Sequence, residues 1–384
     1  MKSLDKTQWL PPKLRSGIQL GIPITLLLVL FCNPLVAASS TIDRSQWPIT
    51  DFSKHNISLA EIFSGGPPKD GIPAIDKPLF ISSAHADKWL REKEPVIVVE
   101  IHGEARAYPI QILIFHEIVN DRIQGIPISV TFCPLCNTAI VFNRQLGKQT
   151  LDFGTTGNLR KSDLLMYDRQ TESWWQQFLG EAVVGKFTGT VLKQLSASVV
   201  SYQAFKKQYP TGQILSRETG FARNYGNNPY QGYDRIDQKP FLYFDPLDAR
   251  LPAMARVLGL VIDGKSKIYP LSKMTTKKIV SDQFMHVPLV IFATESMNSA
   301  LDAAQISNSR LISSATIYTS LLDGKQLSFQ FTHGQITDMQ TGSVWSVFGN
   351  AVSGPLKGKS LTPLNAGVHF AFAWLAFRPD SLIY

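Results

Sequence analysis

The sequence predicts a β-rich α+β protein made of two tandem homologous units with short helices. Three observations support this fold class. One long segment occurs twice in the chain, most hydrophobic runs are short and end at turn-forming residues, and no regular alternation of strands with long helices is visible. With 384 residues, 44% of them hydrophobic, the chain can build a sizeable core, and the disordered class is excluded.

The internal repeat is the strongest of these observations. Residues 105–139 align with residues 266–300 without a gap, and both copies contain a Tyr-Pro pair followed by an aspartate. The relation resumes further along the chain, where 180–195 match 349–364. A duplication is the simplest explanation, and two copies are too few for a solenoid.

The domain organisation follows from the limits of the repeat. We expect unit one at 76–215 and a degenerate copy, unit two, at 238–384. The segment between them, 216–237, is rich in Gly, Asn and Tyr, which is typical of a linker loop. Residues 39–75 read as an irregular N-terminal arm.

Residues 1–38 have the pattern of a signal peptide. Basic residues precede an apolar stretch, and small residues at Val36 and Ala38 offer a cleavage site. We therefore expect an exported protein, periplasmic or extracellular. In the alternative, the segment stays uncleaved and anchors the protein at a membrane, although it is barely long enough to span one.

The elements of unit one are expected in chain order. They are a hairpin over 96–110 turning at His102-Gly103, a short helix over 110–121, a buried strand over 126–132, a hairpin over 139–154 turning at Leu146-Gly147, and a short helix over 201–210 stopped by Pro210. In unit two, Asp263-Gly264 stands where unit one has its first turn.

A Cys-x-x-Cys motif between two predicted strands is the main candidate for a functional site. Its cysteines are Cys133 and Cys136, and the predicted helix before it carries His116. The equivalent positions of unit two are Thr294, Met297 and Lys277. Because all three groups differ together between the copies, the sequence favours one joint site in unit one.

Four interpretations of this site remain open. Two thiolates and an imidazole suit a thiophilic metal ion such as copper or zinc, with Glu117 or Asp121 orienting His116. A redox dithiol has the same spacing, but thioredoxin-like enzymes place it at the start of a helix, whereas a strand is expected here. A structural disulfide would close a very small loop and stabilise little. A cysteine nucleophile activated by His116 is the fourth.

Other chemistry has weaker signals. His369, in an apolar aromatic segment, is expected to be a packed or surface histidine. Removal of four basic and one acidic residue with the signal peptide leaves a mildly positive protein without a basic run, so a nucleic-acid partner is not expected. Common nucleotide-loop, HExxH and GxSxG motifs are missing from the sequence, which disfavours those enzyme classes.

Several separate motifs, in order, resemble one known family. They are "ARAYPIQILIFHEIVND", "VTFCPLCNTAIVFNR", "FGTTGNLRKSDLLMYDRQTESWWQQ" and "LSRETGFARNYGNNPYQGYD". Together they resemble the bacterial and archaeal family called domain of unknown function 3179, over about residues 90 to 384. The resemblance implies an exported protein in which the segments at 116–121 and 133–136 belong to the family pattern. It implies little about activity.

Overall fold

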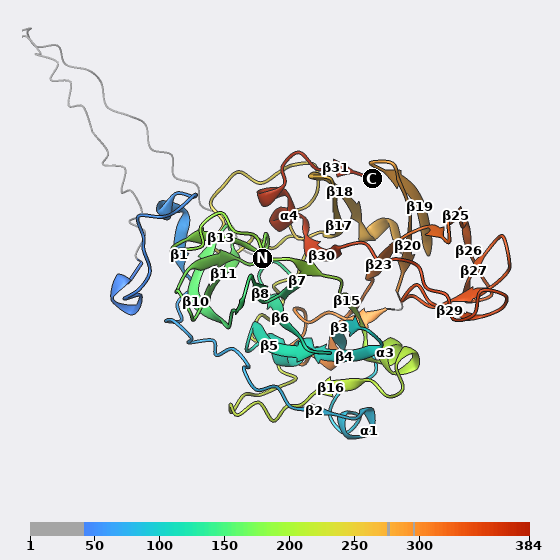
Figure 1. Ribbon diagram of the computed structural model, residues 1–384, viewed down its shortest axis with the longest axis horizontal. Helices are drawn as coiled ribbons and strands as arrows, with labels where there is room; N and C mark the ends of the chain where they lie inside the picture. The colour runs from blue at the N-terminus through green and yellow to red at the C-terminus, as the bar shows by residue number, and fades with distance from the viewer. Residues whose placement is uncertain (1–41, 275–276, 295) are drawn as a thin grey trace, which may run out of the picture. The chain divides into compact units, whose positions relative to one another are not determined.

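The computed structural model describes residues 42–274, 277–294 and 296–384, and it is β-rich. Ser40–Tyr384 form one compact unit, so unit one and unit two belong to the same globular body (Figure 1). The described helices are short: α1 (Ser83–Ala86), α2 (Ile110–Leu113), α3 (Tyr202–Gln208), α4 (Ala371–Phe377), and the 3-10 turns η1 (Arg44–Gln46), η2 (Leu59–Glu61), η3 (Leu271–Met274) and η4 (Ile306–Asn308).

Unit one and the arm before it contribute three sheets and a small hairpin. The first sheet contains, in spatial order, β1 (Ile62–Ser64), β10 (Phe153–Arg160), β11 (Asp163–Asp168), β12 (Trp174–Gln176) and β13 (Glu181–Val184). The second contains β14 (Gln194–Leu195), β7 (Thr138–Asn143), β6 (Ile126–Cys133) and β5 (Ile118–Ile123). The third contains β15 (Ser198–Ser201), β3 (Pro95–Ile101), β4 (Glu104–Pro109), β16 (Gln213–Leu215) and β2 (Phe80–Ile81). The hairpin pairs β8 (Gln145–Leu146) with β9 (Gln149–Thr150).

Unit two contributes three further sheets and two short pairs. One sheet contains β30 (Ala366–Phe370), β17 (Arg256–Ile262), β18 (Lys265–Pro270) and β31 (Leu382–Ile383). Another contains β19 (Ile279–Phe284), β20 (Val287–Ala293) and β23 (Ala315–Thr319), and the third contains β26 (Phe329–Thr332), β27 (Gln335–Asp338), β28 (Val344–Trp345) and β29 (Ala351–Ser353). The pairs are β21 (Met297–Asn298) with β22 (Leu311–Ile312), and β24 (Leu321–Leu322) with β25 (Lys325–Gln326).

Two of these sheets have the same connectivity. In one, the hairpin β3–β4 is flanked by antiparallel β15 and by β16, which runs parallel to β4. In the other, the hairpin β17–β18 is flanked by antiparallel β30 and by β31, which runs parallel to β18. A short helix, α3 or α4, connects the two flanking strands in each case.

The hairpins at 96–110 and the strand at 126–132 form as the sequence predicts. His102 and Asp263 begin the two tight turns with φ of 50° and 47°, and a glycine with positive φ follows each, as two-residue hairpins require. The helix expected over 201–210 is α3, whose first turn is capped by the Ser201 hydroxyl accepting from the Ala204 N–H at 3.2 Å.

The helix expected over 110–121 is wrong for most of its length. Only α2, Ile110–Leu113, is helical, and the strand β5 begins at Ile118. Glu117 lies between them with φ of 58°, which reverses the chain direction. The β-branched residues that follow then pair with β6 and bury their side chains there.

The hairpin expected over 139–154 is correct only at its tip. β8 and β9 pair around Gly147, but β7 pairs with β6 and β14 rather than with the strand that follows the turn. The side chains of 139–142 are apolar, and the position of β7 between β6 and β14 buries most of them.

Residues of both units share the largest hydrophobic core. Val257, Phe370 and Trp374 of unit two pack in the same cluster as Cys133 and Cys136 of unit one. The backbone joins the units at the same point, because the Phe370 N–H donates to the Cys136 carbonyl at 2.9 Å. Unit two therefore supports the segment that carries the cysteines.

The structure describes only part of the N-terminal region for which the sequence makes predictions. The signal peptide predicted for residues 1–38 lies outside the described residues. In the arm, β1 adds one short strand to the sheet of β10, next to the turns η1 and η2. Across the described ranges, no helix has the length and apolar character needed to cross a membrane.

Candidate metal centre

The Cys-x-x-Cys motif forms the loop of the β6–β7 hairpin. Cys133 ends β6 and pairs with Thr138, the first residue of β7. Asn137 adopts a left-handed φ of 49°, which Asn tolerates better than most residues, and its N–H donates to the Pro134 carbonyl at 3.1 Å. The loop therefore turns both cysteines toward one side, and a strand rather than a helix follows them.

A second hairpin brings an aspartate to this loop. Arg160 ends β10 and pairs with Asp163, the first residue of β11. The two residues between them, Lys161 and Ser162, have φ of 53° and 67°. Tight turns of this kind favour Asn and Gly at these positions, so the Lys-Ser turn is strained. Strain of this kind is common at functional sites.

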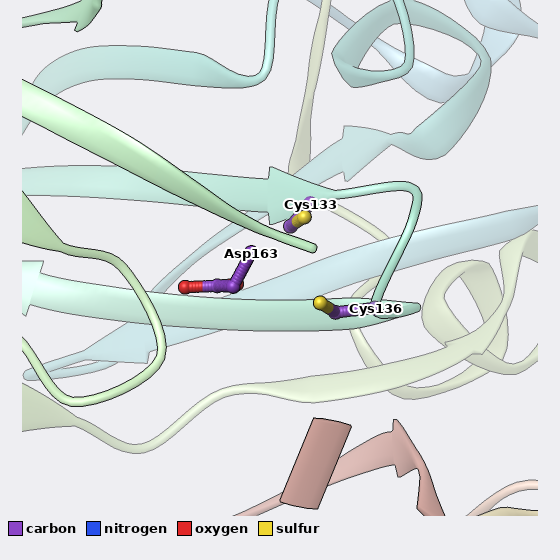
Figure 2. A group of neighbouring side chains, drawn as sticks. All are labelled: Cys133, Cys136 and Asp163. Carbon is purple, nitrogen blue, oxygen red and sulfur yellow. The ribbon is translucent and has the colours of Figure 1, made fainter. Parts of the chain in front are cut away.

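Cys133, Cys136 and Asp163 form a compact group. Their ligand atoms, two sulfurs and a carboxylate oxygen, all lie within 4.8 Å of one another. The exposed fractions of the three side chains are 1%, 0% and 0%. Figure 2 shows Cys133 at the end of a strand and Cys136 on the chain that follows it, with Asp163 beside them; Cys136 lies in the loop before β7 begins at Thr138.

The Asp163 carboxylate is only half satisfied. Its Oδ2 accepts from the Gln176 side-chain amide at 2.6 Å and from the Phe178 N–H at 2.9 Å. Its Oδ1 is fully buried and has no hydrogen-bond partner among the described residues. Because a buried unpaired carboxylate oxygen is costly, this atom is available to a ligand of the group.

The Ser162 carbonyl oxygen also faces the two sulfurs. The Cys136 thiol donates to it at 3.5 Å, and the Cys133 thiol lies 3.9 Å from it. The strained turn thus presents both a carboxylate and a carbonyl oxygen to the cysteines.

Burial makes both thiols poor acids. It raises the pKa of Cys133 and raises the pKa of Cys136 further, and the neighbouring Asp163 charge acts in the same direction. Nucleophilic and redox-active cysteines need a lowered pKa, produced by a cation or a helix N-terminus. The local electrostatics therefore disfavour both of those interpretations.

The pKa values of the two carboxyl groups near the thiols, Asp163 and Glu117, are raised as well. Burial raises the pKa of Asp163 to about 6. Burial, with a contribution from the Asp163 charge, raises the pKa of Glu117 to about 8. None of the ion pairs formed among the described residues involves either carboxylate, so the group is acidic, buried and without a compensating side-chain cation.

His116 does not belong to the group in this structure. Its Nδ1 is 2.7 Å from the Pro73 carbonyl oxygen and its Nε2 is 2.6 Å from the Tyr225 hydroxyl. Burial lowers the pKa of the ring. Both nitrogens are therefore engaged by other partners.

The two residues expected to orient His116 lie in different surroundings. Asp121 accepts from Arg106 Nη1 at 2.7 Å and from the Tyr108 hydroxyl at 2.5 Å. Glu117, in contrast, is electrostatically coupled to the site, since its charge raises the pKa of Cys133. Its side chain lines a cavity of about 540 Å³ together with Leu135, which stands between the cysteines.

No sequence pattern pointed directly to Asp163, which is far from the Cys-x-x-Cys motif along the chain. The two equivalent hairpins, β10–β11 in unit one and β26–β27 in unit two, do provide an indirect signal. Phe153 pairs with Asp168 in β10–β11, and Phe329 pairs with Asp338 in β26–β27. The first hairpin continues well beyond this pair and its extension carries Asp163, whereas the second turns soon after it at His333. A comparison of the two hairpin lengths would have pointed to this extension.

The fold and site define a β-rich protein whose buried Cys-Cys-Asp group can hold a metal ion. The chain belongs to the family described as Protein of unknown function (DUF3179), whose model matches residues 69–381. No curated protein and no solved structure matches the chain. The family match thus agrees with the resemblance of the sequence motifs.

Proposed function

We propose that the protein binds one zinc ion through Cys133, Cys136 and Asp163. The observation that carries this proposal is the group of two sulfurs and a carboxylate oxygen within 4.8 Å of one another. A divalent cation would supply the positive charge that this buried group lacks and would deprotonate both thiols.

The Ser162 carbonyl oxygen is the fourth donor of the proposed site. A tetrahedral zinc ion with Zn–S of about 2.3 Å and Zn–O of about 2.1 Å separates neighbouring sulfur and oxygen ligands by about 3.6 Å. The distances from this oxygen to Cys136 and Cys133, 3.5 and 3.9 Å, are close to that separation. Four protein donors, none of them solvent-accessible, describe a closed site, which is typical of structural zinc.

The donor set favours zinc over copper. Two thiolates suit both metals, but carboxylate and carbonyl oxygens are hard ligands that Cu(I) does not prefer. In this role the ion would clip the β6–β7 hairpin to the β10–β11 hairpin. The clip would keep the Lys161-Ser162 turn in its strained conformation.

The test is the metal content of the protein purified under reducing conditions, with free thiols counted in parallel. We expect about one zinc ion per chain, lost in the Cys133→Ser/Cys136→Ser double variant and in Asp163→Ala. Met166→Leu is the matched control, because Met166 is fully buried in the same core but is not in the donor group. It should keep the metal.

Three further outcomes of these measurements test the ligands, the metal and the function. His116→Gln should keep zinc if the donors are those proposed, and loss of zinc in this variant would restore His116 as a ligand. Stoichiometric copper would overturn the choice of metal. A protein that neither contains nor takes up a metal, and whose two thiols oxidise reversibly, would replace the metal site by a redox pair.

We also propose that units one and two arose by duplication. The support is the shared connectivity of their sheets and two repeated side-chain networks. Trp175 Nε1 donates to Asp168 at 2.9 Å and Trp345 Nε1 donates to Asp338 at 3.0 Å. The Tyr108–Asp121 bond likewise has a counterpart in Tyr269–Asp282, at 2.8 Å. An experimental structure in which the two units fail to superpose over these sheets would refute the duplication.

We further propose that the protein is exported, with residues 1–38 removed as a signal peptide. The support is the basic, apolar and small-residue order of this segment. N-terminal sequencing of the protein recovered from cell fractions tests it. An intact Met1 on protein in the membrane fraction would favour the anchored alternative, and cytoplasmic protein would refute export.

A further inference from the structure

A second cavity lies between residues of the two units. It has a volume of about 330 Å³ and is lined by residues of β7, β14, β17, β30 and α4. In Figure 1, α4 lies beside β30 and β17. Most of the lining residues are apolar, including Phe178, Leu195 and Trp374, but His369, Arg378, Gln194 and Asn365 line it as well.

Arg378 is a cation without an anionic partner among the described residues. Its side chain forms no ion pair and no hydrogen bond with any residue in the described ranges, and its guanidinium carbon stands 5.7 Å from the centre of the Trp374 ring. Burial lowers the pKa of Arg378, and no carboxylate counteracts this effect. A partly buried guanidinium normally has an anion beside it, so the cavity lacks its counter-charge.

His369 adds a directional polar group to the same cavity. Its side chain is 2% exposed, and its Nδ1 is 3.0 Å from the Thr138 hydroxyl. This contact leaves Nε2 without a bond to the described part of the chain. The Nε2 atom lies close to Gly367. A Cβ at residue 367 would approach Nε2 to 2.9 Å, so any larger residue there would push the imidazole ring out of place.

The aromatic rings around His369 define the rest of the site. Phe178 and Trp374 have ring centres 5.0 and 5.1 Å from the imidazole. Burial and the nearby Arg378 charge lower the pKa of His369 to about 3, so the ring is neutral at physiological pH. The ring can then donate one hydrogen bond from Nε2 when the Thr138 hydroxyl donates to Nδ1.

We propose that this cavity is a binding site for a small organic carboxylate with an apolar body. Arg378 neutralises the carboxylate, and its planar guanidinium suits the two oxygens of that group. His369 Nε2 donates a further hydrogen bond, and the apolar and aromatic walls cover the body of the ligand. A free inorganic anion would leave those walls unused, and an uncharged apolar molecule would leave Arg378 unpaired.

This site would also be linked to the cysteine loop by a short chain of contacts. The Thr138 hydroxyl, which contacts His369 Nδ1, donates its hydrogen to the Cys136 carbonyl oxygen at 3.1 Å. A ligand that fixes the His369 hydrogen on Nε2 requires the Thr138 hydroxyl to turn toward Nδ1. The carboxylate site does not depend on a metal ion, however, and its test is independent of the metal content.

The experiment measures binding of benzoate and hexanoate to the purified protein by calorimetry, with benzamide as the uncharged probe. We expect at least one carboxylate to saturate with a Kd of about 1 mM or tighter, and benzamide to bind at least about tenfold more weakly than benzoate. Arg378→Gln should weaken the carboxylate at least about tenfold, which is about 1.4 kcal/mol, and leave benzamide unchanged. Arg378→Lys should retain part of the affinity.

Controls separate this site from unspecific binding. Arg91→Gln, which removes an exposed arginine elsewhere, should bind benzoate as the wild type does. Since the Arg378 side chain forms no ion pair or hydrogen bond within the described part of the chain, and its contact with the Trp374 ring is long, Arg378→Gln should unfold within a few degrees of the wild type. The proposal is overturned if neither carboxylate saturates, if Arg378→Gln binds like the wild type, or if benzamide binds as tightly as benzoate.

Discussion

Replacing Asp163 by asparagine should have opposite effects on the metal-free and the zinc-bound protein. In the metal-free protein the carboxylate is buried, and its pKa rises from 3.8 to about 6. This difference between the folded and unfolded pKa lowers the unfolding free energy by about 3 kcal/mol once the Asp163 carboxyl is ionised in the folded protein. Asparagine has nearly the same shape and carries no charge.

The pH dependence has a definite direction. Below about pH 4 the carboxyl is protonated in both states, so its ionisation contributes nothing. The penalty grows between about pH 4 and pH 6, since only the unfolded chain releases the proton there, and it is complete above pH 6. Asparagine removes the penalty but must rearrange one of the two bonds that Oδ2 accepts, from Gln176 and Phe178, at a cost of about 1 kcal/mol.

The net expectation for metal-free protein is a gain in unfolding free energy of about 2 kcal/mol at pH 8 and a loss of about 1 kcal/mol at pH 4. In the presence of zinc the variant should instead be the less stable protein, because it has lost a ligand and with it the stabilisation by bound metal. Urea unfolding followed by tryptophan fluorescence, with chelator and with zinc, measures all four values.

Asp234→Asn is the matched control for this experiment. Asp234 is also buried, but its Oδ2 accepts from Arg256 Nη2 at 2.6 Å and lies 2.7 Å from Arg310 Nη2. The two arginines outweigh the effect of burial and lower the pKa of Asp234, so its loss should destabilise the protein at both pH values and irrespective of zinc. If Asp163→Asn also destabilises the protein at both pH values and irrespective of zinc, the buried Asp163 charge does not destabilise the metal-free protein, and the reasoning is refuted. Unchanged zinc affinity in Asp163→Asn would refute its role as a ligand.

Three other substitutions test the surrounding structure by thermal and urea unfolding. Tyr108→Phe should lower the unfolding free energy by about 2 kcal/mol, because it removes a buried hydrogen bond to the charged Asp121; no loss would mean that the bond contributes nothing. Ser162→Gly should stabilise the metal-free protein by about 1 kcal/mol, since glycine adopts a φ of 67° without strain, and destabilisation would show that the turn is not strained. Gly259→Ala should destabilise by at least about 3 kcal/mol, because its Cβ would lie 2.0 Å from the Trp374 ring; a wild-type melting temperature would contradict this packing.

Local patterns were enough to predict much of the secondary structure. The Gly-containing turns at 102–103 and 263–264 and the helix before Pro210 depend on residues adjacent in sequence. The helix expected at 110–121 failed because apolar spacing was compatible with both helix and strand. The left-handed backbone of Glu117 ends the helical turn, and the residues after it form a strand because β5 pairs with β6.

The sequence by itself determined the family, the β-rich class and the candidate cysteines, because motifs and turn residues carry that information locally. Only the tertiary structure decided the third member of the group. Asp163 reaches the cysteines through the extension of a separate hairpin, while His116 is held by Pro73 and Tyr225. It also decided the placement of Arg378 and His369 around one cavity. Which side chains share a buried site depends on how sheets pack, and that packing is set by the whole core rather than by any segment of the chain.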